Sequence, residues 1–281
     1  MASAAVGLLH PGEMGVTVGA SAVAGGARVR WASEGRSADT RARALEAKLE
    51  DAGSLEAVVR ASRVILSVVP PHGALALAQA VAGLAFSGVY VDGNAVAPET
   101  SRQIGRVVEA AGARFVDGGI IGPAARKRAT TRLYLSGASA SEVAELFSAG
   151  PIDAVVLDGP AGAASAVKMA YAAWTKGSSA LLATVRAFAV AEDVDAALLA
   201  EWKISQPDAP ARSERAFTDN ARKAWRFVGE MEEIARSLAG AGLPPGFHEA
   251  ARDIYERLTA YKDTKTPPTV EEAAAKVLRR S

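Results

Sequence analysis

A glycine-containing turn near the start of the chain could hold a phosphate group. Residues 4–9 form an apolar run that stops at His10-Pro11-Gly12-Glu13-Met14-Gly15, and small residues of helical character follow. An apolar strand, a glycine turn and a helix form the first unit of a dinucleotide-binding fold. Gly12 would let the backbone approach a pyrophosphate, and Gly15 would let the helix pack on the strand with its amides aimed at the phosphates. His10 stands where GxGxxG has its first glycine, so a turn without any ligand is the alternative.

The next candidate group follows a second predicted strand over residues 27–32. Ser33, Arg36 and Ser37 come directly after this strand, with further basic residues behind them. Two hydroxyls and a guanidinium suit the 2′-phosphate of NADP, because arginine binds phosphate oxygens with two parallel hydrogen bonds. Glu34 competes, since an acidic residue turned inward would favour the ribose hydroxyls of NAD. A solvated, positively charged helix start is the interpretation without a ligand.

A lone lysine marks the second half of the chain. Residues 165–191 contain no proline and carry apolar residues at helical spacing, which predicts a helix roughly 40 Å long. Lys168 lies near the start of this helix. Ala172 and Thr175 follow four and seven residues later on the same side, with Tyr171 at its margin. A single charged residue on a face of small residues is unusual for a core helix.

Alternating strands and helices must position these groups. The first half predicts an α/β domain with a mostly parallel, doubly wound sheet of the Rossmann type over residues 1–160. Residues 161–281 show helical patterns with almost no strand pattern and predict an all-helical domain joined through the long helix. Val69-Pro70, Asn94 and the loop 119–122 would line the crevice at the carboxyl ends of the strands. Asp92 and Asp117 precede glycines and are interpreted mainly as turn and cap formers. The predicted strands cover 64–71, 88–98, 113–117, 131–136 and 154–157, and the predicted helices 16–24, 72–84, 98–111, 194–203, 210–214 continuing into 216–239, 246–261 and 270–278.

Composition excludes several classes of function. The chain of 281 residues has a net charge of +1, so it lacks the basic excess of a nucleic-acid-binding protein. It contains no cysteine, which excludes disulfides and cysteine-type zinc sites, and its three histidines are too widely spaced to predict a metal site. Neither a signal peptide nor a membrane-spanning run is apparent. We therefore expect a soluble cytoplasmic protein that binds a small molecule.

Four segments together resemble the β-hydroxyacid dehydrogenase superfamily. These are GLLHPGEMG, VDGNAVAPETS, FVDGGIIG and DGPAGAASAVKMAYAAWTKG, and the resemblance spans nearly the whole chain. The second half is similar to the phosphogluconate dehydrogenase-like branch with a C-terminal domain of unknown function. The resemblance implies an NADP-binding Rossmann domain, a helical domain that forms a homodimer, and Lys168 as catalytic acid and base. It also implies cofactor contacts from these residues: His10, Pro11, Gly12, Glu13, Met14, Ser33, Arg36, Ser37, Val69, Pro70 and Asn94.

The chain departs from the family where the substrate should bind. The family's serine before two glycines corresponds to Ile121, followed by Gly122, and its asparagine one turn after the lysine corresponds to Ala172. A small hydroxy acid is therefore a doubtful substrate, and a larger or less polar one is favoured. Tyr171, Trp174 and Thr175 would shape the pocket, although Trp174 is equally compatible with a place in the core.

Three functional hypotheses follow. The first is an NADP-dependent oxidoreductase that transfers a hydride between the nicotinamide and a carbonyl or alcohol. The second is an imine reductase on the same scaffold, which the retained Lys168 disfavours. The third is a protein that binds NADP without turnover.

Overall fold

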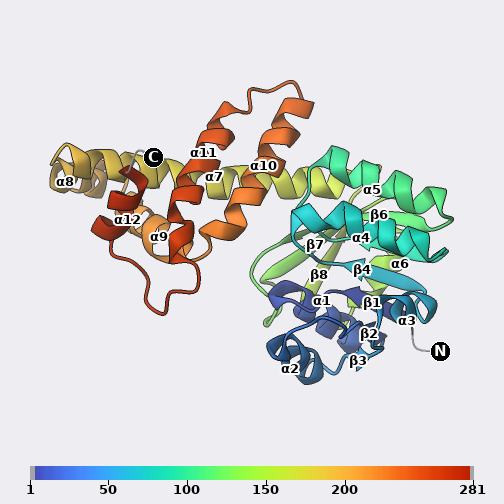
Figure 1. The fold of residues 1–281 in the computed structure, drawn as a ribbon. Helices are drawn as coiled ribbons and strands as arrows, with labels where there is room; N and C mark the ends of the chain where they lie inside the picture. Colours follow the sequence, from blue (N-terminus) through green and yellow to red (C-terminus); the bar gives the residue numbers. More distant parts are fainter. Residues whose placement is uncertain (1–3, 279–281) are drawn as a thin grey trace. The chain divides into compact units, whose positions relative to one another are not determined.

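The chain forms two compact units that divide within its longest helix. The computed structural model describes residues 4–278. One unit is Met1–Met169 and the other Ala170–Ser281, so helix α7 (Ala163–Ala191) contributes to both (Figure 1). The sequence prediction had placed a domain boundary nine residues earlier, between 160 and 161.

The first unit contains an eight-stranded sheet in the order β3-β2-β1-β4-β5-β6-β7-β8. All neighbouring strands pair in parallel except β6 and β7, which are antiparallel. The predicted Rossmann-like sheet is thereby confirmed. The strands are β1 Ala5–Leu9, β2 Arg28–Trp31, β3 Glu50–Asp51, β4 Val64–Ser67, β5 Val89–Asp92, β6 Arg114–Ile121, β7 Thr131–Ser136 and β8 Ile152–Val156.

Two apolar cores lie on opposite faces of this sheet. Along β4, Val64 and Leu66 belong to one core and Ile65 to the other, because successive side chains of a strand point to opposite faces. The first core includes residues of α1 and α6, and the second includes residues of α3, α4 and α5; α4 and α5 run side by side in Figure 1. The helices of this unit are α1 Glu13–Ala24, α2 Ala38–Glu46, α3 Leu55–Arg60, α4 Pro71–Gly83, α5 Pro98–Ala110 and α6 Ala140–Ala144, followed by the short 3-10 turn Glu145–Phe147.

The structure corrects three local predictions. The expected loop over 119–122 is largely strand, because β6 continues to Ile121 and pairs there with β7. The short elements β3 and α3 were not predicted, since neither is long enough to show a periodic pattern. The helix predicted over 216–239 is divided between two helices, one ending at Ala221 and the next beginning at Ala224.

The second unit is helical throughout its described residues. Arg186 of α7 binds Asp195 with two hydrogen bonds of 2.6 and 2.9 Å and donates a third to the hydroxyl of Ser213, which ties three helices together. A second ion pair joins Lys176 to Glu230 at 2.8 Å. None of the helices over residues 4–278 is long and apolar enough to cross a membrane. Besides α7 these helices are α8 Asp195–Ser205, α9 Ala209–Ala221, α10 Ala224–Gly240, α11 Gly246–Leu258 and α12 Val270–Leu278, with a 3-10 turn at Thr259–Tyr261.

Candidate active site

The two glycines of the β1–α1 turn have different structural roles. A Cβ added to Gly15 would lie 1.9 Å from the carbonyl oxygen of His10, so only glycine lets α1 pack this closely on the end of β1. A Cβ added to Gly12 would meet no atom within 4 Å. Gly12 is the N-cap of α1 and provides no side-chain cap, so open space lies beside a helix N-terminus. This arrangement fits the pyrophosphate of a dinucleotide.

Basic side chains gather at the carboxyl end of β2. Arg41 donates from Nη2 to the backbone oxygen of Ser33 at 2.8 Å, and Arg43 donates to the hydroxyl of Thr40 at 3.0 Å. Ser33 is buried, whereas Glu34 is exposed. The first turns of α2 thus carry guanidinium groups beside this loop, and the loop's acidic residue is on the surface.

Two further residues of this loop have defined contacts. Ser37 is the N-cap of α2, and its hydroxyl accepts a hydrogen bond from the Thr40 amide. Arg36 donates from Nη2 to Nε2 of His10, 2.5 Å away in the β1–α1 turn. The predicted pyrophosphate turn and the predicted 2′-phosphate loop are thus in direct contact.

Asn94 connects the ends of β4 and β5. Its side-chain oxygen accepts from the Val69 amide at 2.6 Å, and its amide nitrogen donates to the hydroxyl of Ser67 and to the carboxylate of Asp92. Asn94, Ser67 and Asp92 are all buried. These bonds place two predicted cofactor segments, Val69-Pro70 and Asn94, next to each other at the carboxyl ends of neighbouring strands.

Lys168 packs on the next strand at the same level. The parallel register pairs Asp92 with Asp117, so Asn94 lies two residues beyond the end of β5 and Gly119 lies two residues further along β6. A Cβ added to Gly119 would lie 2.5 Å from the Ala164 oxygen and 3.1 Å from the Cβ of Lys168. Glycine at this position therefore lets the first turns of α7, including Lys168, rest on β6 near the carboxyl ends of the parallel strands, where ligands bind in sheets of this kind.

A buried carboxylate fixes the start of α7. Asp117, fully buried in β6, accepts hydrogen bonds from the Gly162 and Ser165 amides at 3.0 and 2.9 Å and from the Ser165 hydroxyl at 2.5 Å. It also accepts from the hydroxyls of Ser101 and Ser136 at 2.7 and 3.0 Å. A negative charge at a helix N-terminus satisfies amides that have no partner within the helix. Asp117 thus caps α7, as predicted for it in general terms, but from within a strand.

The predicted substrate residues beyond Lys168 differ widely in exposure. Ile121 is buried in β6, and Gly122 turns the chain beyond it with a φ of 127°. On α7, Ala172 is fully buried, whereas Tyr171 and Trp174 are 48% and 67% exposed. The exposure of Trp174 excludes it from the core of this chain, which was the alternative considered for it.

Thr175 lines an open hollow of the helical unit. Its own hydroxyl donates back to the Tyr171 oxygen at 3.0 Å. Arg212, Arg215 and Lys223 line the same hollow, with Asp219 as its acidic member. The hollow therefore carries a positive excess beside a residue that lies two helical turns beyond Lys168.

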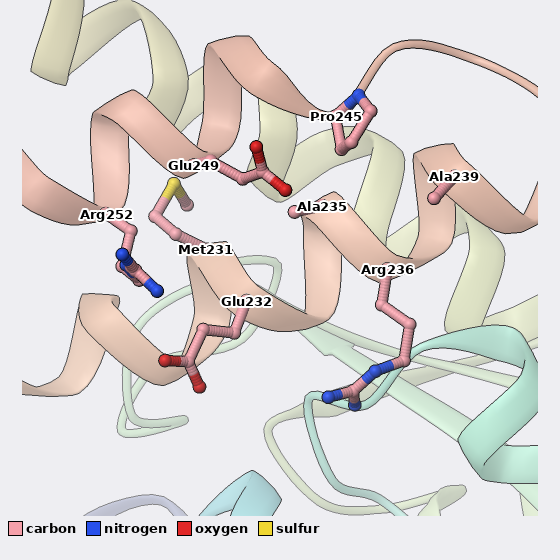
Figure 2. Close-up of a pocket in the computed structure, with 8 residues that line it drawn as sticks. All are labelled: Met231, Glu232, Ala235, Arg236, Ala239, Pro245, Glu249 and Arg252. Carbon is pink, nitrogen blue, oxygen red and sulfur yellow. The ribbon is translucent and has the colours of Figure 1, made fainter.

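A second hollow lies between α10 and α11 (Figure 2). Met231 and Ala235 provide apolar surface there, and charged side chains surround it. Two of these, Arg236 and Arg252, are paired with neighbouring acids on their own helices. The hollow contains no predicted site residue. Over residues 4–278, no three His, Cys, Asp or Glu side chains are grouped so as to hold a metal ion.

The first unit thus brings together the predicted cofactor segments and Lys168 along one edge of its sheet. Sequence analysis missed the residues that support them: Ser67 beneath Asn94, and Ser101, Ser136 and Ser165 around Asp117. Isolated serines in strands and helices carry no distinguishing pattern, and their partners are distant in the chain. Of these serines and their partner Asp117, only Asp117 could be singled out from the sequence, because it stands before two glycines.

Two family models match the sequence. Residues 4–149 match the NAD binding domain of 6-phosphogluconate dehydrogenase, and residues 189–258 match a domain of unknown function. A comparison with curated proteins returns no match.

Solved structures resemble the whole chain. One is a conserved protein of unknown function, itself similar in structure to 3-hydroxyacid dehydrogenases; it is 28% identical, with a TM-score of 0.71 over 98% of this chain and 99% of its own. The 3-hydroxyisobutyrate dehydrogenase of Mycobacterium tuberculosis is 18% identical, with a TM-score of 0.70 over 99% of this chain and all of its own. The reductive aminase of Aspergillus terreus, solved with NADPH and ethyl levulinate, is 18% identical, with a TM-score of 0.56 over 97% of this chain and 99% of its own.

Proposed function

Since this chain belongs to the β-hydroxyacid dehydrogenase-like family of NAD(P)-dependent dehydrogenases and reductases, we propose that it transfers a hydride between NADP(H) and a carbonyl or alcohol substrate, with Lys168 as general acid and base. The packing of Lys168 on Gly119 carries this proposal, because a lysine whose Cβ lies against β6 can extend its amine toward the edge of the sheet where the proposed cofactor segments lie.

The proton transfer assigned to Lys168 follows from the charge that the reaction develops. When bound, the cofactor supplies or accepts the hydride. Reduction of a carbonyl places negative charge on its oxygen, and the Lys168 ammonium group neutralises that charge by donating a proton. In the oxidative direction the neutral amine removes the alcohol proton. Asp117 and Gly119 hold the start of the helix that carries the lysine and thus support the position of its backbone relative to the sheet.

The choice of NADP rests on the β2–α2 loop. Arg36 in the loop and Arg41 and Arg43 in the following helix α2 supply positive charge, and the competing Glu34 is exposed. Guanidinium groups bind phosphate oxygens more strongly than ribose hydroxyls. The reductive aminase of similar fold was solved with NADPH, which agrees with the same choice.

We infer a larger substrate than a short hydroxy acid. Ile121 and Ala172 offer no polar group for a carboxylate beside Lys168. A larger or less polar carbonyl compound suits a lysine that has no such polar group at these two positions.

We also propose that the chain forms a homodimer through its helical unit. Leu181 and Phe188 on α7 are 48% and 63% exposed, and Ile204 on α8 is exposed as well. Large apolar side chains gathered on helices commonly mark an interface between subunits.

Imine reduction is the second candidate. The similarity to the reductive aminase and the absence of a polar group at Ile121 favour it. Lys168 weighs against it, because the resemblance implies an acidic residue or tyrosine at this position in imine reductases.

The test is to follow NADPH oxidation with two substrate pools. One holds keto acids and aldehydes, including larger and less polar members, and the other holds cyclic and preformed imines; NADH is run alongside. Turnover of the carbonyl pool that is lost in Lys168→Ala supports the proposal. Turnover of imines alone favours the second candidate, and tight NADPH binding without turnover of either pool favours a protein that binds the cofactor without using it.

A further inference from the structure

We propose that His10 is a specificity-determining residue that holds the Arg36 guanidinium in place for the 2′-phosphate of NADP. The inference rests on the proposed NADP-dependent function and names the residue that sets the cofactor preference. His10 occupies a position where the dinucleotide-binding turn ordinarily has glycine. The turn would therefore serve the pyrophosphate through its glycines and, through His10, also position Arg36.

The contact itself defines the state of the imidazole. Arg36 donates from Nη2 to Nε2 of His10 at 2.5 Å, across 26 residues of sequence. A guanidinium group has donors and no acceptor, so Nε2 must carry the lone pair and the ring proton must be on Nδ1. Burial, together with the nearby charge of Arg36, lowers the pKa of His10 to about 4, so the ring is neutral at physiological pH. A neutral ring accepts from Arg36, whereas an imidazolium would repel it.

Polar atoms left over in this corner match a ligand with several oxygens. His10 Nδ1 and Arg36 Nε are shielded from solvent and have no hydrogen-bond partner among residues 4–278, and the same is true of Arg43 Nε. A buried donor without an acceptor is costly, and few occur in folded proteins. All three atoms belong to the β1–α1 turn and the β2–α2 region, where the proposed cofactor carries its pyrophosphate, ribose and 2′-phosphate oxygens.

The histidine would act by ordering the arginine before the cofactor binds. A free arginine side chain samples many rotamers and loses that freedom when it binds a phosphate. An arginine already held by His10 loses less, so more of its interaction with the phosphate appears as affinity. The gain applies only to a cofactor with a 2′-phosphate. The turn keeps its backbone function, because Gly12 remains open and Gly15 still allows the helix to pack.

The experiment compares cofactor preferences by titration calorimetry. Kd values for NADP⁺ and NAD⁺ are measured for the wild type, His10→Ala, Arg36→Ala and the double variant, and the ratio Kd(NAD⁺)/Kd(NADP⁺) is the readout. We expect a wild-type ratio above about tenfold, and a loss of about tenfold in this ratio in His10→Ala. The double variant should lose no more than Arg36→Ala alone, because His10 acts through Arg36. Competition by 2′-AMP and 5′-AMP then isolates the phosphate contribution.

Two further variants separate positioning from general damage. His10→Gln places an amide oxygen where it can accept from Arg36, and should restore most of the preference. Arg41→Ala removes a nearby charge, in helix α2, that is bonded to the backbone oxygen of Ser33 instead of to His10. Its effect on the ratio should therefore add to that of His10→Ala.

The outcomes distinguish this inference from the proposed function. A wild type that favours NADP⁺ while His10→Ala keeps the full ratio overturns the role of His10 and leaves the cofactor choice intact. Additive effects of His10→Ala and Arg36→Ala also overturn it. A wild type that binds NAD⁺ as well as NADP⁺ contradicts the proposed cofactor itself.

Discussion

The sheet unit and the helical unit differ in what their polar and apolar side chains do. In the sheet unit Asn94 and Asp117 each connect several elements at the ligand-binding edge. In the helical unit Thr175, Thr184 and Thr218 donate back to carbonyl oxygens of their own helices. Among residues 4–278, large exposed apolar side chains are divided the opposite way, with two in the sheet unit and ten in the helical unit. The sheet unit thus has polar groups that connect its elements at one edge, whereas the helical unit exposes most of the large apolar side chains.

The largest predicted effect comes from comparing two lysines on α7, Lys168 in the sheet unit and Lys176 in the helical unit. Lys168→Ala should lower kcat by about 10²–10⁴-fold, because a positioned acid and base contributes about this much to a reaction. Its affinity for NADP⁺ should not change, since Lys168 is assigned to the substrate. Steady-state kinetics and calorimetry measure the two effects.

Lys176, eight residues further on, is the matched control. It pairs with Glu230 and lies over the ring of Phe227, at 5.2 Å from the ring centre. Lys176→Met should lower the melting temperature and largely preserve kcat. An equal loss of kcat in a well-folded Lys176→Met variant would mean that the chemistry extends into the helical unit.

The second test concerns the capping of α7 by Asp117. Ser165→Ala removes a hydroxyl that α7 donates to Asp117, and Ser101→Ala removes one that α5 donates. Each should lower the free energy of unfolding by roughly 1–2 kcal/mol. Only Ser165→Ala should also lower kcat, because only this bond belongs to the helix that carries Lys168. Denaturant unfolding and kinetics provide both readouts, and equal kcat values would show that Asp117 stabilises the fold without positioning the lysine.

The third test uses the two glycines of the β1–α1 turn. Gly15→Ala should destabilise the protein by about 1–3 kcal/mol or more, because its Cβ would lie 1.9 Å from the His10 oxygen. Gly12→Ala has room for its Cβ and should leave the melting temperature nearly unchanged. It should weaken NADP⁺ binding about tenfold by occupying the space assigned to the pyrophosphate. A Gly12→Ala variant with full cofactor affinity would place the pyrophosphate elsewhere.

The sequence correctly predicted those strands and helices whose local residue pattern agrees with their place in the fold. The strand, glycine turn and helix at residues 4–24 were predicted because each element has its own periodicity, and Gly15 proved to have the packing role expected of it. The long α7 helix was predicted within two residues at its start, since no proline or strand signal competes there.

Contacts between residues that are distant in the chain could not be predicted from the sequence. The extension of β6 to Ile121 depends on antiparallel pairing with β7, and glycines inside a strand suggest a loop when the partner strand is unknown. The cap of α7 joins Asp117 to Ser165 across 48 residues. The His10–Arg36 contact likewise joins two separately predicted loops, and only the folded sheet brings them together.

The fourth test addresses the apolar surface of the helical unit. Leu181 and Phe188 lie seven residues apart, on one side of α7. Replacing both with serine should weaken self-association by about 1–3 kcal/mol per side chain without lowering the melting temperature of the monomer. Sedimentation velocity over a range of concentrations measures this. A wild-type protein that stays monomeric and active contradicts the proposed dimer.

The smallest effect, confined to acid, concerns the imidazole of His10. Its pKa in the folded protein is lowered from 6.5 to about 4, so between these values the unfolded chain binds a proton there that the folded chain does not. The free energy of unfolding therefore falls, on account of this residue, as the pH is lowered through that range. His10→Ala removes this loss. The melting temperature of the variant minus that of the wild type should therefore increase as the pH is lowered from about 6.5 to about 4, and should be constant above about pH 6.5. His72→Ala removes an exposed imidazole of the same unit and serves as the control. A melting-temperature difference between His10→Ala and wild type that does not change with pH would show that the imidazole is not held neutral in the folded turn. The contact between His10 and Arg36 would then lack the neutral acceptor on which it depends.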